Sequence, residues 1–174
     1  MVKQDFSRLP INPLFAVGTC YFQRCHLTSG LYKGCMAELN KREPVYLHEL
    51  AVPAKAIDGN GHVNNVAYVQ WMQDVAILHW ESLGGMEIDE AENCTWVARS
   101  HRIEYLRPAY EGEVIQIRTW IDNVRRVRSV RKYEFKRLSD DQLLARGETD
   151  WVFIDVDTGR PKPIPDFVGE NILG

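Results

Sequence analysis

The segment Asp58-Gly59-Asn60-Gly61-His62 places a carboxylate and an imidazole in a stretch that can turn tightly. A carboxylate can act as a general base toward water, or can attack a carbonyl carbon itself. Taken alone, the segment is typical of a turn, because Gly and Asn tolerate positive φ and Asp bonds to nearby backbone amides. A lone histidine such as His62 is also more often structural than catalytic. The chemical interpretation therefore depends on the element that the segment leads into.

A buried helix is expected directly after it. Asn64 and Asn65 are both good N-caps, and the helix should run to about Leu83, where Gly84-Gly85 supply a stop. Asp58 would then lie before free backbone N–H groups at the positive end of the helix dipole. Such donors stabilise the negative charge that develops on an acyl oxygen, at roughly 10²- to 10³-fold in rate per donor. The arrangement predicts acyl hydrolysis, and a thioester needs little more because a thiolate leaves readily.

The elements around this helix predict how it is held. Its polar residues form one narrow stripe, so other structure must wrap most of its circumference. Residues 45–54 read as a strand, and short turns separate the strand-like runs 94–106, 113–123, 129–138 and 143–155, which indicates an antiparallel meander. In the last run the alternate residues Ala145, Gly147 and Thr149 are small, which lets a sheet approach a thick helix. The predicted class is α+β, with a long central helix wrapped by an antiparallel sheet of about five strands.

Over about residues 45–155 the sequence resembles the hotdog-fold acyl-CoA thioesterases related to 4-hydroxybenzoyl-CoA thioesterase. The residues that carry the resemblance are Asp58, Gly61, His62, Val63, Asn64, Asn65 and Tyr68, then Ile103-Glu104-Tyr105-Leu106-Arg107-Pro108-Ala109 and Gly112. It implies a single hotdog domain in which Asp58 is the catalytic base or nucleophile. It also implies that the backbone N–H of about Asn65 polarises the thioester carbonyl.

The spacing Asp58-x-Asn60-x-His62 is also similar to the catalytic segment of plant acyl-ACP thioesterases. That resemblance implies that Asn60 and His62 position Asp58 or the attacking water. The plant enzymes carry two hotdog repeats, whereas this chain has length for one, so both acyl-CoA and acyl-ACP remain as substrates. Another branch of the fold uses a helix glutamate, for which this helix offers only Asp74 and Glu81.

Two further sets of residues are candidates for binding substrate. Helix residues that could wall an acyl pocket, or could equally be plain core, are Tyr68, Trp71 and Met72. A basic segment could bind the phosphates of CoA, or could be a solvated face, through Arg125, Arg126, Arg128 and Arg131. The resemblance further implies a homodimer or homotetramer, because a hotdog active site lies at a subunit boundary.

Other functions fit the sequence less well. A hotdog hydratase or dehydratase would carry Asp-x-Asn-Pro-x-His, but here the Pro is missing and the His comes one residue early. A noncatalytic acyl-binding module could dispense with Asp58. A metallohydrolase would need His residues at ligand-like spacing, which the chain does not offer. We therefore predict no metal and no cofactor.

The composition of the chain limits the class of protein to which it can belong. With 174 residues, 45% of them hydrophobic, and a net charge of −3, the chain is typical of a soluble globular protein and not of a nucleic-acid or membrane protein. Cys94 opens an apolar run, where a buried small hydrophobe is expected rather than a nucleophile. We expect an irregular extension at 1–43, a hotdog domain at 44–157 and a tail at 158–174. The expected location is the cytoplasm, which we favour over organelle targeting by the extension.

Overall fold

The computed structural model describes residues 45–166 and 168, which all fall in one unit, Asn40–Gly174. The predicted N-terminal extension, residues 1–43, lies outside the described residues. Among those described, no helix is both long and apolar enough to span a bilayer.

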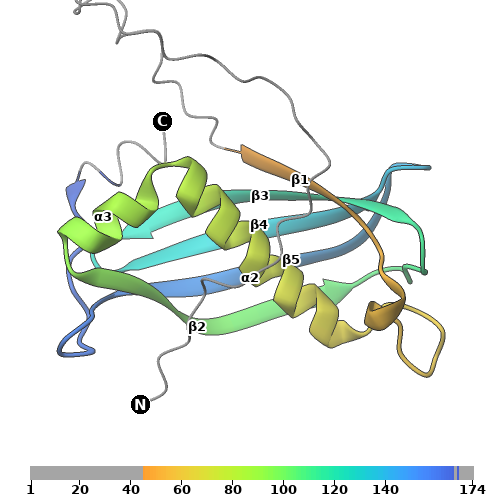
Figure 1. Ribbon diagram of the computed structural model, residues 1–174, viewed down its shortest axis with the longest axis horizontal. Helices are drawn as coiled ribbons and strands as arrows, with labels where there is room; N and C mark the ends of the chain where they lie inside the picture. Colours follow the sequence, from red (N-terminus) through yellow and green to blue (C-terminus); the bar gives the residue numbers. More distant parts are fainter. Residues whose placement is uncertain (1–44, 167, 169–174) are drawn as a thin grey trace, which may run out of the picture. The chain divides into compact units, whose positions relative to one another are not determined.

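A single sheet of five strands forms one layer of the fold (Figure 1). All neighbouring strands are antiparallel, in the order β1-β3-β4-β5-β2. The strands are β1 (Val45–Ala51), β2 (Cys94–Tyr105), β3 (Val114–Arg125), β4 (Arg128–Arg137) and β5 (Gln142–Asp155). The five predicted strands are confirmed, and β3, β4 and β5 form a meander.

The prediction that β2 continues this meander is wrong. β2 pairs with β5 at one edge of the sheet, and β1 occupies the position beside β3. The connection between β2 and β3, residues 106–113, therefore passes across the end of the sheet instead of making a hairpin turn. This crossing brings the connection to the end of β1, where the Val52 N–H donates to the Glu113 carbonyl at 2.9 Å.

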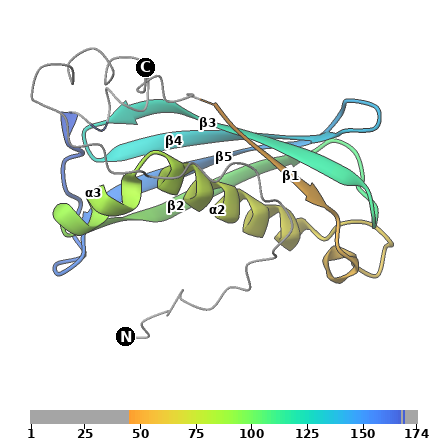
Figure 2. The ribbon, with the colours of Figure 1, turned by 45° about the horizontal axis from the view of Figure 1, so that its top comes forward.

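The second layer is the long helix α2 (Asn65–Ser82), which lies across one face of the sheet (Figure 2). Gly84 adopts φ 72°, the left-handed conformation expected of a helix stop. A short helix that the sequence did not predict, α3 (Gly85–Ala91), follows at once. A Cβ on Gly85 would lie 2.1 Å from the Trp80 ring, so only glycine fits where the chain turns between the two helices.

The sheet approaches α2 closely at the stripe of small residues on β5, as predicted. Ala145 and Thr149 are fully buried, and a Cβ on Gly147 would lie 3.0 Å from the Met72 sulfur. Met72 is itself completely buried. The main apolar core thus forms between the first half of α2 and β3, β4 and β5.

A second apolar cluster lies at the other end of α2. It joins Trp80 and Leu83 to Phe153 of β5, and two residues of the predicted tail, Ile164 and Val168, are buried in it. The described part of the tail, residues 158–166 and 168, therefore contributes to the core, and Asp166 and Val168 have a helical backbone.

Candidate active site

A closed loop between Ile57 and Val63 carries the predicted catalytic segment. Ile57 and Val63 form an isolated antiparallel bridge, and inside it the Asp58 N–H donates to the His62 carbonyl at 3.0 Å. The Gly61 N–H donates back to the Asp58 carbonyl at 3.0 Å, and Gly61 has φ 79°. The glycine at 61 is therefore required by the turn, which fixes the backbone of both Asp58 and His62.

The structure brings the three predicted side chains of this loop together. The Asp58 carboxylate accepts from the Asn60 backbone N–H at 2.8 Å, and the Asn60 side-chain amide is 3.5 Å from its other oxygen. His62 Nδ1 lies 3.9 Å from Asp58 Oδ1. The carboxylate is 24% exposed and the imidazole 39% exposed, so both can reach substrate and water. The contact to the Asn60 N–H is also the one a structural turn would make.

The surroundings of His62 favour one tautomer. Nδ1 faces two acceptors, the Asp58 carboxylate at 3.9 Å and the Val63 carbonyl at 3.4 Å. A proton on Nδ1 suits both, which leaves Nε2 as the acceptor nitrogen.

The first turn of α2 supplies the expected backbone donor. The Asn64 side chain caps the helix by accepting from the Val66 N–H at 2.8 Å, and the Asn64 carbonyl accepts from the Ala67 N–H at 2.9 Å. Neither contact uses the N–H of Asn65, the first residue of the helix. This amide lies at the positive end of the helix dipole and can donate to a ligand.

Neighbouring segments hold this end of the molecule in place. The Asn64 N–H donates to the Ala56 carbonyl at 2.8 Å, and the Val63 N–H donates to the Ala109 carbonyl at 2.9 Å. The Tyr105 hydroxyl, on edge strand β2, donates to the Asn65 carbonyl at 3.3 Å. Tyr105 belongs to the second family-like run, but its side chain had no role assigned from the sequence.

The predicted acyl-pocket residues are packed as core in this protomer. Tyr68 and Met72 are buried, and Trp71 is half-buried against the main cluster. The Tyr68 ring makes edge contacts with Trp71 and Phe135, at centroid distances of 5.3 and 5.1 Å. Burial raises the pKa of Tyr68 to about 12, so its phenol stays neutral. Their role as pocket walls stays a prediction.

The four predicted phosphate-binding arginines lie in different surroundings, and the burial of Arg131 speaks against it as a phosphate ligand, while the role of the others stays a prediction. Arg131 is buried on the side of the sheet that faces α2, with Nη1 2.8 Å from His79 Nδ1. Burial lowers the pKa of its guanidinium. Arg128 is ion-paired with Asp150, and of the four only Arg125 and Arg126 are exposed.

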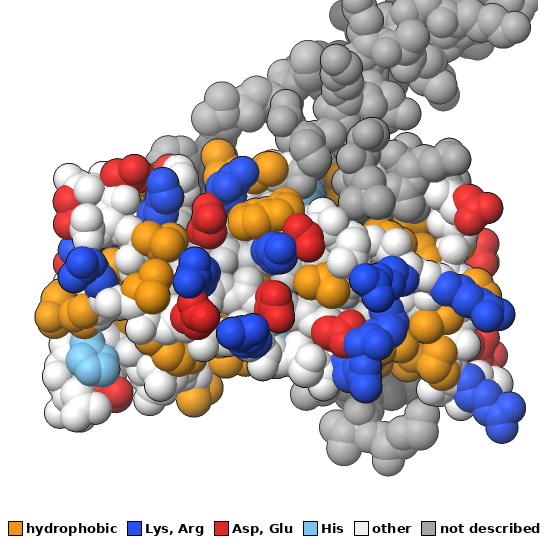
Figure 3. All heavy atoms as spheres, turned by 180° about the vertical axis from the view of Figure 1, so that it is seen from behind, with side chains coloured by type: hydrophobic (Ala, Val, Ile, Leu, Met, Phe, Trp, Pro, Cys, Tyr) orange, Lys and Arg blue, Asp and Glu red, His pale blue; other side chains and the backbone are white. Residues whose placement is uncertain are grey.

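On the opposite face, a hollow of about 280 Å³ takes in two of these arginines. Its lining is Ser100, Arg102, Asn123, Arg125, Arg128, Val130, Glu148 and Asp150. This face of the sheet carries intermingled cations and carboxylates rather than one block of positive charge (Figure 3).

The cysteine and the helix carboxylate that could also have served catalysis make other contacts. Cys94 is buried, and burial raises the pKa of its thiol to about 12, with help from Asp89. It therefore packs as the small hydrophobe that the sequence indicated. On the helix, Asp74 accepts from the Gln70 side chain at 2.8 Å on the exposed face. Across the described residues, no three His, Cys, Asp or Glu side chains gather as metal ligands would.

Known proteins share both the sequence pattern and the fold. The family model of the thioesterase-like superfamily matches residues 52–172. Oleoyl-acyl carrier protein thioesterase 1 of Arabidopsis thaliana is 26% identical over 136 residues, which are 74% of this chain and 37% of that protein. The chain thus spans little more than a third of this curated relative.

Solved structures agree on the architecture. A 1,4-dihydroxy-2-naphthoyl-CoA thioesterase from Synechocystis superposes with a TM-score of 0.67 at 21% identity, covering 74% of this chain and 96% of that one. The 12:0-ACP thioesterase from Umbellularia californica gives 0.66 at 20% identity, covering 74% and 49%. The fold is therefore the predicted hotdog-like thioesterase fold. This chain belongs to the thioesterase-like superfamily.

Proposed function

We propose that the protein hydrolyses acyl thioesters to a carboxylic acid and a thiol, with Asp58 as the catalytic carboxylate. One observation carries the proposal: Asp58, Asn60 and His62 converge in a closed loop that leads directly into the N-terminus of α2. The loop joins a partly exposed carboxylate to a helix end that retains an unused donor, and hydrolysis of an acyl group needs both.

In the proposed reaction the thioester oxygen accepts from the Asn65 N–H, which polarises the carbonyl. Asp58 takes a proton from water as that water attacks the carbonyl carbon, and the tetrahedral intermediate then collapses and expels the thiolate. Alternatively, the Asp58 carboxylate attacks the carbonyl carbon itself and the thiolate leaves, and water then hydrolyses the resulting mixed anhydride to the free acid and the regenerated carboxylate. In both routes Asn60 and His62 hold the carboxylate or the water in position.

The carrier of the acyl group is proposed to be CoA or acyl carrier protein. The exposed side chains of Arg125 and Arg126 suit either the phosphates of CoA or an acidic carrier protein. The similar proteins include thioesterases of both kinds.

We further propose that the active unit is a homodimer, alone or within a homotetramer. One of the two edge strands in the described sheet is β2, a strand of 12 residues that carries the exposed side chains of Val97 and Tyr105. Val66, at the start of α2, is 72% exposed. A long edge with apolar side chains is a surface that proteins usually cover by pairing. A monomeric mass by light scattering at assay concentration would contradict this.

The experiment that tests the activity measures thiol release from aryl-, short-, medium- and long-chain acyl-CoAs and acyl-ACPs. We expect turnover of at least one member, and an Asp58→Asn variant should lose roughly 10²- to 10⁴-fold in kcat. Asp122→Asn is the matched control, because Asp122 is an exposed carboxylate on β3 that pairs with Lys132 at 3.0 Å. No thiol release from any member would refute the proposal. Hydration of an enoyl-CoA without thiol release would favour the hotdog hydratase. Binding of an acyl-CoA without any turnover would favour the noncatalytic acyl-binding module.

A further inference from the structure

The connection between β2 and β3, residues 106–113, is a direct support of the Asp58 loop. Its Ala109 carbonyl accepts from the Val63 N–H at 2.9 Å, and Ala109 is buried. Val63 is also bridged to Ile57, so these two residues close the loop on either side of Asp58. A displacement of Ala109 would therefore move both ends of the loop.

A single guanidinium, that of Arg137 at the end of β4, fastens this connection. Its Nη2 donates to the Pro108 carbonyl at 2.9 Å, and its Nε lies 3.0 Å from a Glu113 carboxylate oxygen. Its Nη1 donates to Asp140 at 3.0 Å. Pro108 and Glu113 flank Ala109 on either side, so Arg137 ties the two halves of the connection to β4.

Glu113 also holds the connection of residues 106–113 in place, through its carboxylate and its backbone carbonyl. Its carboxylate accepts from the Tyr110 N–H at 3.0 Å, next to Ala109. Its backbone carbonyl accepts from Val52 at the end of β1 at 2.9 Å. Arg137 is only 16% exposed and Glu113 24%, so this pair is better shielded from water than the ion pairs on the outer face.

We propose that Arg137 is a positioning residue for the Asp58 loop, acting through Glu113 and the Ala109 carbonyl. The inference rests on the proposed function, since it assigns Arg137 to the reaction only by way of Asp58. Arginine is required because a planar guanidinium can donate two hydrogen bonds in fixed directions, to Pro108 and Asp140, and still hold its charge beside the Glu113 carboxylate, which a compact ammonium cannot do. Arg137 itself touches no reacting atom.

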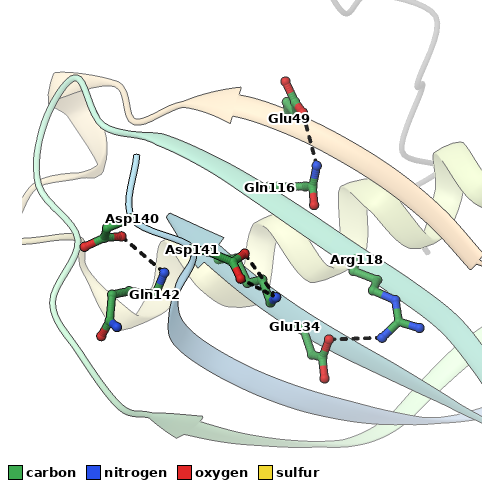
Figure 4. A network of polar contacts seen from close by, with 8 residues as sticks. Glu49, Gln116, Arg118, Glu134, Asp140, Asp141 and Gln142 are labelled. Carbon is green, nitrogen blue, oxygen red and sulfur yellow. Dashed lines mark hydrogen bonds and ion pairs between the residues drawn. The ribbon is translucent and has the colours of Figure 1, made fainter. Parts of the chain in front are cut away.

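The test compares Arg137→Gln and Arg137→Lys with the control Arg118→Gln. Arg118 lies on β3 and pairs with Glu134 on β4 at 3.2 Å (Figure 4). We expect Arg137→Gln to lower kcat roughly ten- to a hundred-fold with KM little changed, because small misplacements of a catalytic group cost that much. Arg137→Lys should recover part of the loss, and Arg118→Gln should behave as wild type.

A second measurement uses amide hydrogen exchange in residues 57–64 and does not depend on turnover. In Arg137→Gln we expect faster exchange at Val63 and Asn64, with protection in β4 and β5 unchanged. Unchanged kcat in the folded variant, or exchange that rises evenly over the sheet, would overturn the proposal. If Arg137→Gln does not fold, Glu113→Gln tests the same Arg137–Glu113 contact, because it removes the charge at residue 113 and keeps the size of the side chain. If the wild type hydrolyses no thioester, the proposed function fails and the exchange pattern alone decides.

Discussion

Replacing Gly85 by alanine tests how tightly the chain turns between α2 and α3. The added Cβ would lie 2.1 Å from two atoms of the Trp80 ring. Gly85 has no positive φ, so the cost comes from the space beside Trp80 and not from backbone strain. The ring would have to move by more than about 1 Å to restore contact, which places the cost near the upper end of the roughly 1–3 kcal/mol typical of overpacking. Alanine regains at most about 1 kcal/mol of helix propensity, the value for a helix interior, because Gly85 is the first residue of α3.

The expected net loss is therefore about 2 kcal/mol in the free energy of unfolding, or about 4–8 °C in Tm for a chain of this size. Urea unfolding followed by tryptophan fluorescence measures it, with Gly59→Ala as the control because a Cβ there meets nothing within 4 Å. The Trp80 indole also donates to Asp89 at 3.0 Å, so near-ultraviolet dichroism should change. If Gly85→Ala were as stable as Gly59→Ala, the ring would not be packed against this glycine.

Two further predictions concern groups near the same helix. Burial raises the pKa of Asp89, so the folded state holds its proton more tightly than the unfolded state, and stability falls as pH rises from the ordinary carboxyl pKa through the raised one. The Asp89→Asn variant should therefore be at least as stable as the wild type at pH 7, and any gain in stability should disappear at a pH below the ordinary carboxyl pKa. Urea unfolding at pH 7 and at that lower pH measures the difference. A marked loss of stability in the variant at pH 7 would contradict the prediction. Burial also raises the pKa of the Cys94 thiol to about 12, so this thiol should react with an alkylating reagent at pH 8 only after the protein is denatured. Rapid labelling of the native protein at Cys94, read by mass spectrometry, would show that the thiol is accessible.

Local chemistry explains what the sequence could predict. The Asp58 loop and the start of α2 are set by contacts between residues two to four apart, such as the Asn64 cap and the Asp58–His62 backbone pair. Residue types report such contacts directly. The small residues on β5 likewise report a face that must approach a helix.

Contacts between residues far apart in the chain explain what the sequence could not predict. The position of β2 beside β5 depends on β1 occupying the edge of β3, which no local pattern encodes. Arg137 acquires its role only when the β2–β3 connection passes over the end of β4. The inner position of Arg131, by contrast, follows from the sequence, because the alternation Ser129, Arg131, Tyr133, Phe135 places it on the inner face of its strand.

The burial of Ile164 and Val168 against Trp80, Leu83 and Phe153 has a consequence for synthesis. A chain that leaves the ribosome from its N-terminus presents α2 and all five strands before these two residues emerge. Until then the last turns of α2 and the end of β5 lack the apolar contacts that Ile164 and Val168 make with them in the described structure. Late nascent chains should therefore be the species that chaperones bind, and fragments ending at residue 157 should aggregate although they contain the whole sheet.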